Sequence, residues 1–316
     1  MNRRSDHGYS PRFSPALLAP RHWPTWAALG LYGLIGLLPW RARAGLGRWI
    51  GDRIYHHNHR RRHIVMVNLA LCFPELEEGA RERLARDYFR RLAQSSLDYG
   101  MLWWGSGARL DRKVSIEGMT HLLRCREAGR PVILLTGHTV ALDFGATAVT
   151  RRISTVGLVK PVRNPVIEWL MSRGRTRYRG RLFLRRHGLR PVIAALRRGE
   201  AFYYLPDEDL SHVKGGEWIF APFFGVPTAT ITALGRLARI TGAAVLPCES
   251  WYLPDEGRYR LTIHPPLQDY PTGEVVADTE RMNRELEAMI RRHPEQYMWS
   301  LRLFKTRPEG EPSPYR

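Results

Sequence analysis

Apolar and polar residues alternate in blocks from about residue 112 onward, and these blocks predict a regular succession of strands and helices. Short apolar runs bounded by Pro and Gly predict buried strands, and the amphipathic stretches between them predict helices. The predicted strands are residues 131–135, 153–160, 181–184, 201–205, 243–252 and 259–263. The predicted helices are residues 141–150, 165–177, 189–198, 229–241 and 278–292. This alternation is typical of an α/β fold, with a mostly parallel sheet flanked by helices on both faces.

The N-terminal 110 residues lack strand-like runs. Residues 1–20 are polar, basic and contain Pro, so we expect them to be disordered. Residues 44–110 have apolar positions at helical spacing, most clearly over 78–104, and we expect them to pack on the α/β domain that follows. We expect this α/β domain to comprise residues 111–316.

An uncharged segment lies between these two parts of the N-terminal region. Residues 23–40 contain no charged side chain, and Trp23, Trp26 and Trp40 stand near the two ends. Aromatic residues are enriched at the two interfaces of a membrane. We therefore expect residues 21–43 to form a membrane anchor helix, which either spans the bilayer or lies in its interface. A buried core helix is the alternative.

The composition indicates an anionic partner. The formal net charge is +19 and comes mostly from Arg, whose planar guanidinium binds phosphate and carboxylate groups in a bidentate manner. An anionic membrane and a nucleic acid both fit this charge. Cys72, Cys125 and Cys248 form no C-x-x-C pair, so neither a disulfide framework nor a zinc site is indicated.

The strongest candidate for chemistry is a histidine at the end of the predicted strand 131–135. His138 follows this strand, and Asp143, five residues later, stands at the start of a predicted helix. If Asp143 bonds one ring nitrogen, the other nitrogen is free to accept a proton. These two residues are two-thirds of a Ser-His-Asp triad, and a hydroxyl of the substrate would serve as the nucleophile. A satisfied core histidine is the alternative.

Two other places in the chain have the same His-x4-acid spacing. His264 precedes Asp269, but Pro265 and Pro266 block a helix start there. His212 precedes Glu217 in a Gly-rich loop that no strand enters directly. Only His138 combines a buried strand, a Gly turn and a helix.

Two charged clusters are also candidates for a site. Asp207 and Asp209 follow the predicted strand 201–205, and they would bind a metal, hold an arginine or form an ordinary acidic turn. Arg175 and Arg177 belong to an Arg-rich run that would grip phosphate groups, contact RNA or lie in solvent at a helix end.

Two further local patterns complete the picture. Asn164 precedes Pro165 and predicts an N-cap with Pro at the first helical position. Residues 220–227 form an apolar aromatic loop that would line an acyl chain or plug the core. Neither a GxGxxG motif nor a P-loop is present in the sequence, which disfavours nucleotide binding.

Several sequence blocks, taken in order, carry a resemblance to one protein family. They are residues 68–75 (NLALCFPE), His138-x4-Asp143, Asn164-Pro165, Gly180-Arg181, 204–209 (YLPDED), 222–227 (PFFGVP), 293–299 (HPEQYMW) and 304–310 (FKTRPEG). The chain resembles the late acyltransferases of lipid A biosynthesis, the lauroyl and myristoyl transferase family. Residues 300–303 (SLRL) are closer to the myristoyl branch.

The resemblance implies a reaction and its participants. A fatty acyl chain of the lauroyl or myristoyl class would move from acyl carrier protein to a hydroxyl of a 3-hydroxyacyl chain on a Kdo-bearing lipid A precursor. His138 would be the base, and Asp143 would orient its ring. Either a backbone N–H near Gly137 or an arginine such as Arg175 would stabilise the oxyanion. The resemblance implies neither a cofactor nor a metal. The expected substrate-binding residues are Asn164, Arg175, Arg177, Asp207 and Asp209.

The resemblance also implies a location, and two alternative functions remain. The protein would lie at the inner membrane with its catalytic domain facing the cytoplasm. A glycerolipid or lysophospholipid acyltransferase is the nearest alternative, because it shares the His-x4-Asp element. A membrane-anchored nucleic-acid-binding protein is the non-enzymatic alternative. The sequence contains no nucleic-acid-binding motif, however, and we do not expect a nucleic-acid partner.

Overall fold

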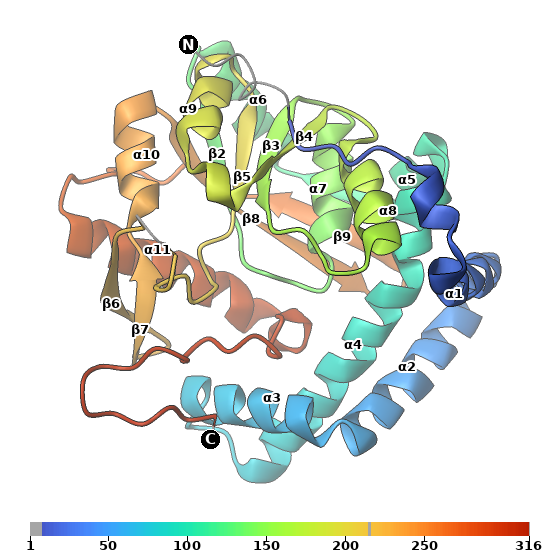
Figure 1. The fold of residues 1–316 in the computed structure, drawn as a ribbon. Helices are drawn as coiled ribbons and strands as arrows, with labels where there is room; N and C mark the ends of the chain where they lie inside the picture. Colours follow the sequence, from blue (N-terminus) through green and yellow to red (C-terminus); the bar gives the residue numbers. More distant parts are fainter. Residues whose placement is uncertain (1–7, 214–215, 316) are drawn as a thin grey trace.

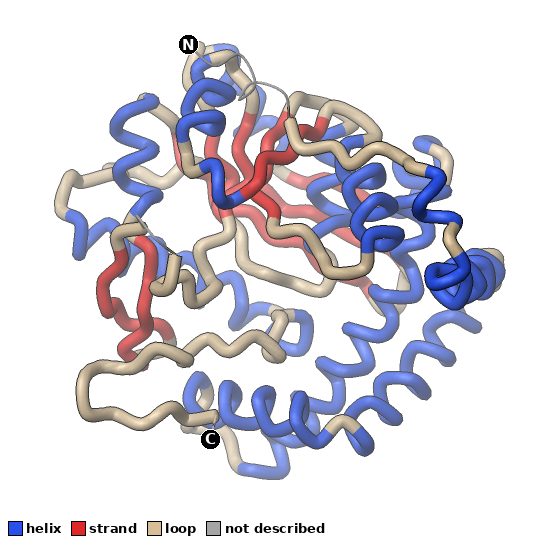
Figure 2. Tube along the Cα trace, viewed as in Figure 1, coloured by secondary structure: helices blue, strands red, loops and turns tan. Residues whose placement is uncertain are grey.

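A seven-stranded sheet forms the centre of the protein in a computed structural model, which describes residues 8–213 and 216–315 (Figures 1 and 2). The strand order is β1-β9-β8-β2-β5-β3-β4. All neighbouring strands are parallel except β8 and β9, which form an antiparallel hairpin. The predicted α/β class with a mostly parallel sheet is therefore confirmed. The strands are β1 (Val114–Glu117), β2 (Val132–Leu135), β3 (Thr155–Val159), β4 (Gly180–Leu184), β5 (Ala201–Tyr204), β8 (Ala244–Leu253) and β9 (Arg258–Ile263).

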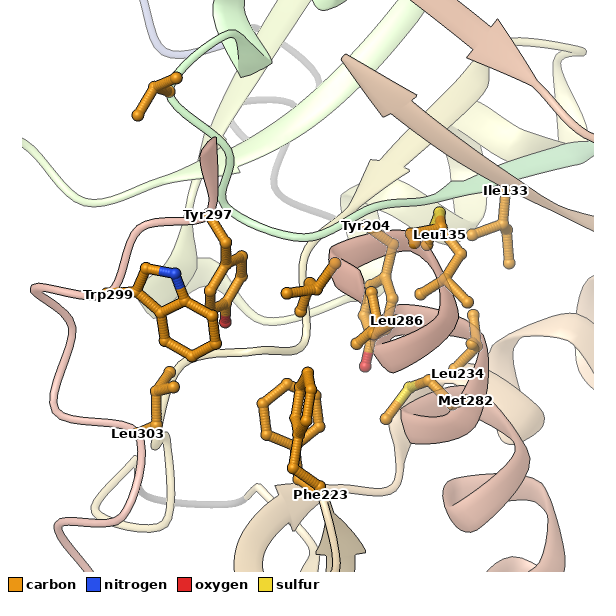
Figure 3. Close-up of a cluster of buried hydrophobic side chains, with 14 of the residues drawn as sticks. Ile133, Leu135, Tyr204, Phe223, Leu234, Met282, Leu286, Tyr297, Trp299 and Leu303 are labelled. Atoms are coloured by element: carbon orange, nitrogen blue, oxygen red, sulfur yellow. The ribbon is translucent and has the colours of Figure 1, made fainter. Parts of the chain in front are cut away.

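Helices cover both faces of the sheet, because alternate residues of each central strand point to opposite sides. Ile133 and Leu135 belong to a core that includes side chains of α9, α10 and α11. Figure 3 shows these two residues with Leu234 of α10 and with Met282 and Leu286 of α11. Val132 and Leu134 belong to a second core with α6 and α7. Helix α8 lies beside α7. The helices around the sheet are α6 (Met119–Glu127), α7 (Leu142–Thr150), α8 (Pro165–Thr176), α9 (Arg190–Arg197), α10 (Ala233–Thr241) and α11 (Val275–Arg292).

The predicted aromatic loop at residues 220–227 is instead part of a hairpin. Strands β6 (Trp218–Phe223) and β7 (Val226–Ile231) pair in antiparallel fashion and lie against α11. Phe223 and Phe224 at the turn are buried in the first core. Because residues 229–231 belong to β7, the helix predicted from residue 229 begins only at Ala233 in α10.

Four helices, α2 to α5, form the region predicted to be helical over residues 44–110. The long helix α4 has the predicted bounds, and α2 lies along it (Figure 1). Gly47 and Gly51 permit this close contact, because a Cβ on Gly51 would lie 2.5 Å from the Cα of Arg90 in α4. The helices are α2 (Trp40–His57), α3 (His59–Cys72), α4 (Glu78–Trp104) and α5 (Gly107–Lys113).

The anchor helix predicted over residues 21–43 is not found as one helix. The segment contains α1 (Trp23–Ile35), a break at residues 36–39, and the start of α2. The 13 residues of α1 would extend about 20 Å, against about 30 Å for the hydrocarbon core of a bilayer. Within residues 8–213 and 216–315, no helix is both long and apolar enough to cross a membrane.

The segment before α1 differs from the predicted disorder. Residues 1–7 lie outside the described residues. From Gly8 onward the chain follows the protein surface, where the Tyr9 N–H donates to the Leu182 carbonyl of β4. Two short 3₁₀ helices follow, Pro15–Leu18 and Pro20–His22. The backbone contact with β4 and the buried Leu17 hold this segment on the body.

Candidate active site

His138 lies just beyond β2, at the edge where the parallel strands end. Its backbone N–H donates to Asp207 Oδ2 over 2.6 Å, and its carbonyl accepts from the Met298 N–H over 2.8 Å. Two segments far apart in the sequence therefore fix the backbone of this residue. The carboxyl ends of parallel strands are the usual place for a ligand in an α/β protein.

Asp207 orients the His138 ring. This residue follows β5, the strand beside β2, and its Oδ1 lies 2.7 Å from His138 Nδ1. Its Oδ2 also accepts from the Tyr297 hydroxyl over 2.9 Å, and its side chain is fully buried. With Nδ1 bound in this way, Nε2 is the nitrogen left for chemistry. Glu208 Oε1 lies 3.4 Å from Nε2, and Glu208 also pairs with Arg185.

Electrostatics favours a proton on this histidine. Burial lowers the pKa of His138, but the Asp207 carboxylate more than offsets burial, so the pKa lies above its ordinary value of 6.5. Burial raises the pKa of Asp207, but His138 and the hydrogen bond from Tyr297 outweigh burial and lower it. The aspartate therefore stays ionised, and an imidazolium formed beside it is stabilised.

Asp143 has a different partner from the one we predicted. Arg175 donates two hydrogen bonds to this carboxylate, from Nε to Oδ1 and from Nη2 to Oδ2, each over 2.9 Å. Asp143 Oδ2 also accepts a hydrogen bond from the Tyr99 hydroxyl over 2.8 Å. In the part of the chain that the structure describes, no hydrogen bond joins Asp143 to His138. Burial raises the pKa of Asp143, and the Arg175 charge outweighs burial and lowers it. The carboxylate that fixes an arginine is thus Asp143, and the one that fixes the histidine ring is Asp207.

The other expected substrate-binding residues lie outside the cavity that His138 faces. Asn164 caps α8, where its Oδ1 accepts from the N–H groups of Val166 and Ile167. Arg177 donates to the Gly105 carbonyl. Asp209 accepts from the Thr306 N–H and from Ser211. Their contacts hold loops and a helix end in place, and substrate binding by these three residues stays a prediction.

A cavity of about 1000 Å³ opens in front of His138, Asp143 and Arg175. Much of its wall is apolar, formed by side chains such as Leu158, Met171 and Ile193. Arginines gather in the same wall. They include Arg181, Arg185, Arg186, Arg190 and Arg236. A cavity of this kind accommodates an aliphatic chain together with anionic groups.

Sequence comparison identifies the family. The sequence model of the bacterial lipid A biosynthesis acyltransferases matches residues 10–306, which include all the site residues described above. The chain belongs to this family.

Three named relatives of this acyltransferase cover nearly its whole length. The lipid A biosynthesis lauroyltransferase of Escherichia coli (strain K12) is 36% identical over 96% of this chain and 99% of the relative. The lipid A biosynthesis palmitoleoyltransferase of the same organism is 36% identical over 96% of this chain and 98% of the relative. Its myristoyltransferase is 31% identical over 99% and 97%. The overall identity is thus higher with the first two, although residues 300–303 resemble the myristoyl branch.

Sequence reasoning missed three side chains of the candidate site in this acyltransferase. Tyr99 comes from α4, Tyr297 from the segment after α11, and Glu208 lies next to Asp207. Two of them bind the buried carboxylates, and Glu208 lies near Nε2. The block containing Tyr297 carried part of the family resemblance, which was the only signal for that residue. No local pattern marks Tyr99.

Proposed function

We propose that this acyltransferase moves a fatty acyl chain of the lauroyl or myristoyl class from acyl carrier protein to a 3-hydroxyacyl chain on a Kdo-bearing lipid A precursor. One observation carries the proposal. His138 is held by Asp207 at Nδ1, so that Nε2 is available beside a large, partly apolar cavity with an arginine-rich wall. A base, a space for an acyl chain and a positive surface for phosphate groups therefore lie together.

The reaction proceeds by direct transfer. His138 Nε2 removes the proton from the acceptor hydroxyl as its oxygen attacks the thioester carbonyl, and Asp207 stabilises the resulting imidazolium. The tetrahedral intermediate collapses, the C–S bond breaks, and the imidazolium returns the proton to the departing thiolate of the carrier. An ester and a free thiol are formed. The thioester is already activated, so the enzyme contributes proton transfer, typically worth about 10²–10⁴-fold, and positioning.

Arg175 and Gly137 are the candidates for stabilising the oxyanion. Asp143 occupies Nε and Nη2 of Arg175, and the guanidinium lines the cavity, so its remaining nitrogen is the one available to a substrate oxygen. The Gly137 N–H makes no hydrogen bond among the described residues. We assign the main charge stabilisation to Arg175, because Asp143 and Tyr99 fix its position before substrate binds.

The arginines in the cavity wall give the two substrates a common electrostatic basis. Phosphates and Kdo carboxylates of the acceptor are anionic, and acyl carrier protein is acidic. Arg186, Arg190 and Arg236 line the cavity together with Lys160. Charge complementarity of this kind speeds encounter and fixes orientation more than it adds affinity.

The proposed location is the cytoplasmic face of the inner membrane. Large apolar side chains are exposed on the N-terminal helices and their connection, where Trp23, Leu34, Leu37 and Trp49 are 62%, 63%, 74% and 58% exposed. Exposed apolar groups of this size mark a contact surface for membrane or protein. We infer that they enter the membrane interface, which brings the cavity close to its lipid acceptor.

A transfer assay with purified protein tests the proposal. Wild-type enzyme should acylate a Kdo-bearing lipid A precursor from acyl carrier protein, and His138→Ala should lose at least about 10³-fold in kcat while remaining folded. His264→Ala is the matched control, because His264 has the same spacing to an acidic residue but pairs with Glu249 outside the cavity. Full activity in His138→Ala would show that His138 is not the general base.

Acceptor competition separates the nearest alternative. A glycerolipid or lysophospholipid acyltransferase would prefer a lysophospholipid acceptor over the lipid A precursor when both are supplied together. The nucleic-acid alternative predicts tight, salt-dependent RNA or DNA binding that His138→Ala leaves unchanged.

A further inference from the structure

A second cavity, of about 420 Å³, lies between α2, α4 and the hairpin of β8 and β9. It shares no lining residue with the cavity in front of His138. Aromatic rings connect the part of the protein next to Asp143 with this cavity. The ring of Phe144 stacks on the ring of Tyr259, with 3.7 Å between their centroids, and the centroids of the Tyr259 and Tyr252 rings are 5.1 Å apart. The proposed reaction does not use this cavity. We call it the α2–α4 cavity.

Cationic side chains predominate in the wall of the α2–α4 cavity. Four arginines and one acidic residue line it: Arg41, Arg48, Arg90, Arg91 and Asp255. Arg90 is neutralised by ion pairs with Asp52 and Asp87. Arg48 and Arg91 have no ion pair or hydrogen bond within the described part of the chain. A cluster of this kind, with little acidic compensation, attracts an anion.

Two residues of the same wall each have a buried hydrogen-bond donor with no partner among the described residues. These donors are Arg91 Nε and the Tyr252 hydroxyl, and the Tyr252 side chain belongs to a residue that is only 1% exposed. Buried polar groups are almost always paired, so these donors would gain a hydrogen bond from an acceptor that a small movement of their side chains brings within reach. A third unpartnered atom, Gln94 Oε1, lies against Gly47 at the contact of α2 with α4.

The state of Tyr252 suits a donor. Burial and the Asp98 charge raise its pKa to about 12, and Arg91, Arg43 and Arg48 act in the opposite direction. The hydroxyl therefore keeps its proton at neutral pH. Arg48, Arg91 and Tyr252 all line the α2–α4 cavity.

We propose that the α2–α4 cavity binds a phosphate group, held by Arg48 and Arg91 and by a hydrogen bond from the Tyr252 hydroxyl. Ionised phosphate oxygens are strong acceptors, and guanidinium groups donate charge-assisted hydrogen bonds to them. Trp40, which also lines the cavity, directly follows the exposed turn that contains Leu37 and Leu38. The phosphate therefore belongs either to a phospholipid headgroup or to a free phosphate ion.

The first arm of the test measures free phosphate. Full-length protein is titrated with sodium phosphate, with sodium chloride at equal ionic strength as the reference, and the melting temperature is followed. Tyr252→Phe and Arg91→Gln should each raise the apparent dissociation constant about tenfold, the effect of losing one charge-assisted hydrogen bond. Tyr252→Phe removes a hydroxyl that has no partner in residues 8–213 and 216–315, so the variant should fold normally.

The second arm measures a lipid headgroup. Co-sedimentation with phosphatidylglycerol vesicles compares the same variants with Arg124→Gln, a control that removes one exposed arginine of α6 far from the α2–α4 cavity. Weaker binding of the variants in both arms, or to vesicles only, identifies a headgroup; weaker binding of phosphate only identifies the free ion.

Equal behaviour of Tyr252→Phe, Arg91→Gln, the control and wild type in both arms would overturn the proposal. Neither arm uses an acyl donor, so the result stands apart from the proposed transfer reaction.

Discussion

Replacing Asp207 by Asn distinguishes the two carboxylates near His138 most sharply. Asp207 Oδ2 accepts two hydrogen bonds, from the His138 N–H and the Tyr297 hydroxyl, whereas Oδ1 faces His138 Nδ1. In Asp207→Asn, the amide oxygen must take the place of Oδ2, because two donors point there. The NH₂ group then faces Nδ1 and donates to it. The ring proton moves to Nε2, and the base that the reaction needs is lost.

The size of the effect follows from this change of tautomer. In a Ser-His-Asp triad, the equivalent change lowers kcat about 10⁴-fold with the geometry intact. We expect a loss of about 10³–10⁴-fold here, which is about 4–5.5 kcal/mol of transition-state stabilisation. The fold should persist, since Asn keeps the hydrogen bonds to the His138 backbone and to Tyr297.

The assay is acyl transfer under saturating donor and acceptor, with kcat measured against pH. Asp143→Asn is the matched control, because it makes the same chemical change in a buried carboxylate that contacts Arg175 and Tyr99 instead. It should lose less than about 10²-fold in kcat and keep the acid limb of the wild-type profile. Near wild-type kcat in Asp207→Asn together with a collapse in Asp143→Asn would refute the assignment of Asp207.

Three further predictions concern pH, the arginine and the fold. Wild-type kcat should fall as pH decreases, because the base must be unprotonated. Since the pKa of His138 lies above its ordinary value, we expect kcat to reach half its maximum above pH 6.5, and a lower midpoint would contradict this prediction. Arg175→Met leaves Asp143 buried without its cation, and urea denaturation should show a loss of about 2–3 kcal/mol, less than the 3–5 typical of fully buried pairs because the Arg175 side chain is 32% exposed. Asn68→Ala removes donors to the carbonyls of Trp299 and Leu301, and should cost about 2–4 kcal/mol in the same measurement; a loss below 1 kcal/mol would mean that the C-terminal tail is not held there.

The sequence pattern predicted the central strands and the helices between them well, because buried strands are continuous apolar runs and the helices are amphipathic. The elements that the pattern missed are β1, α6 and the β6–β7 hairpin. In the β6–β7 hairpin Pro222 stands opposite Pro227, and Pro in a short run argues against a strand. The anchor prediction was wrong as a single helix because it rested on the absence of charge over residues 23–40. It gave too little weight to Gly36 and Pro39, which stand at the two ends of the break.

The sequence could indicate the position of His138, but it could not indicate the partner of its ring. A strand that ends in Gly-His marks a position at the edge of the sheet, and this reasoning favours His138 over His264. His138 does line the large cavity, whereas the ring of His264 pairs with Glu249. The partner of His138 depends on strand order, however. β5 lies beside β2, which brings Asp207 to the ring, and α8 lies beside α7, which brings Arg175 to Asp143. Local spacing carries no information on either neighbour.

The central claim is that a hydroxyl of the lipid acceptor completes the site formed by His138 and Asp207. Mass spectrometry of the product tests this claim most directly, with acyl carrier protein thioester as donor and two acceptors, a Kdo-bearing lipid A precursor and its analogue without the 3-hydroxyl groups. The account predicts that the first acceptor gains the mass of one acyl chain with wild-type enzyme and that the analogue gains none. Acylation of the analogue, or no acylation of the hydroxylated precursor, would contradict it.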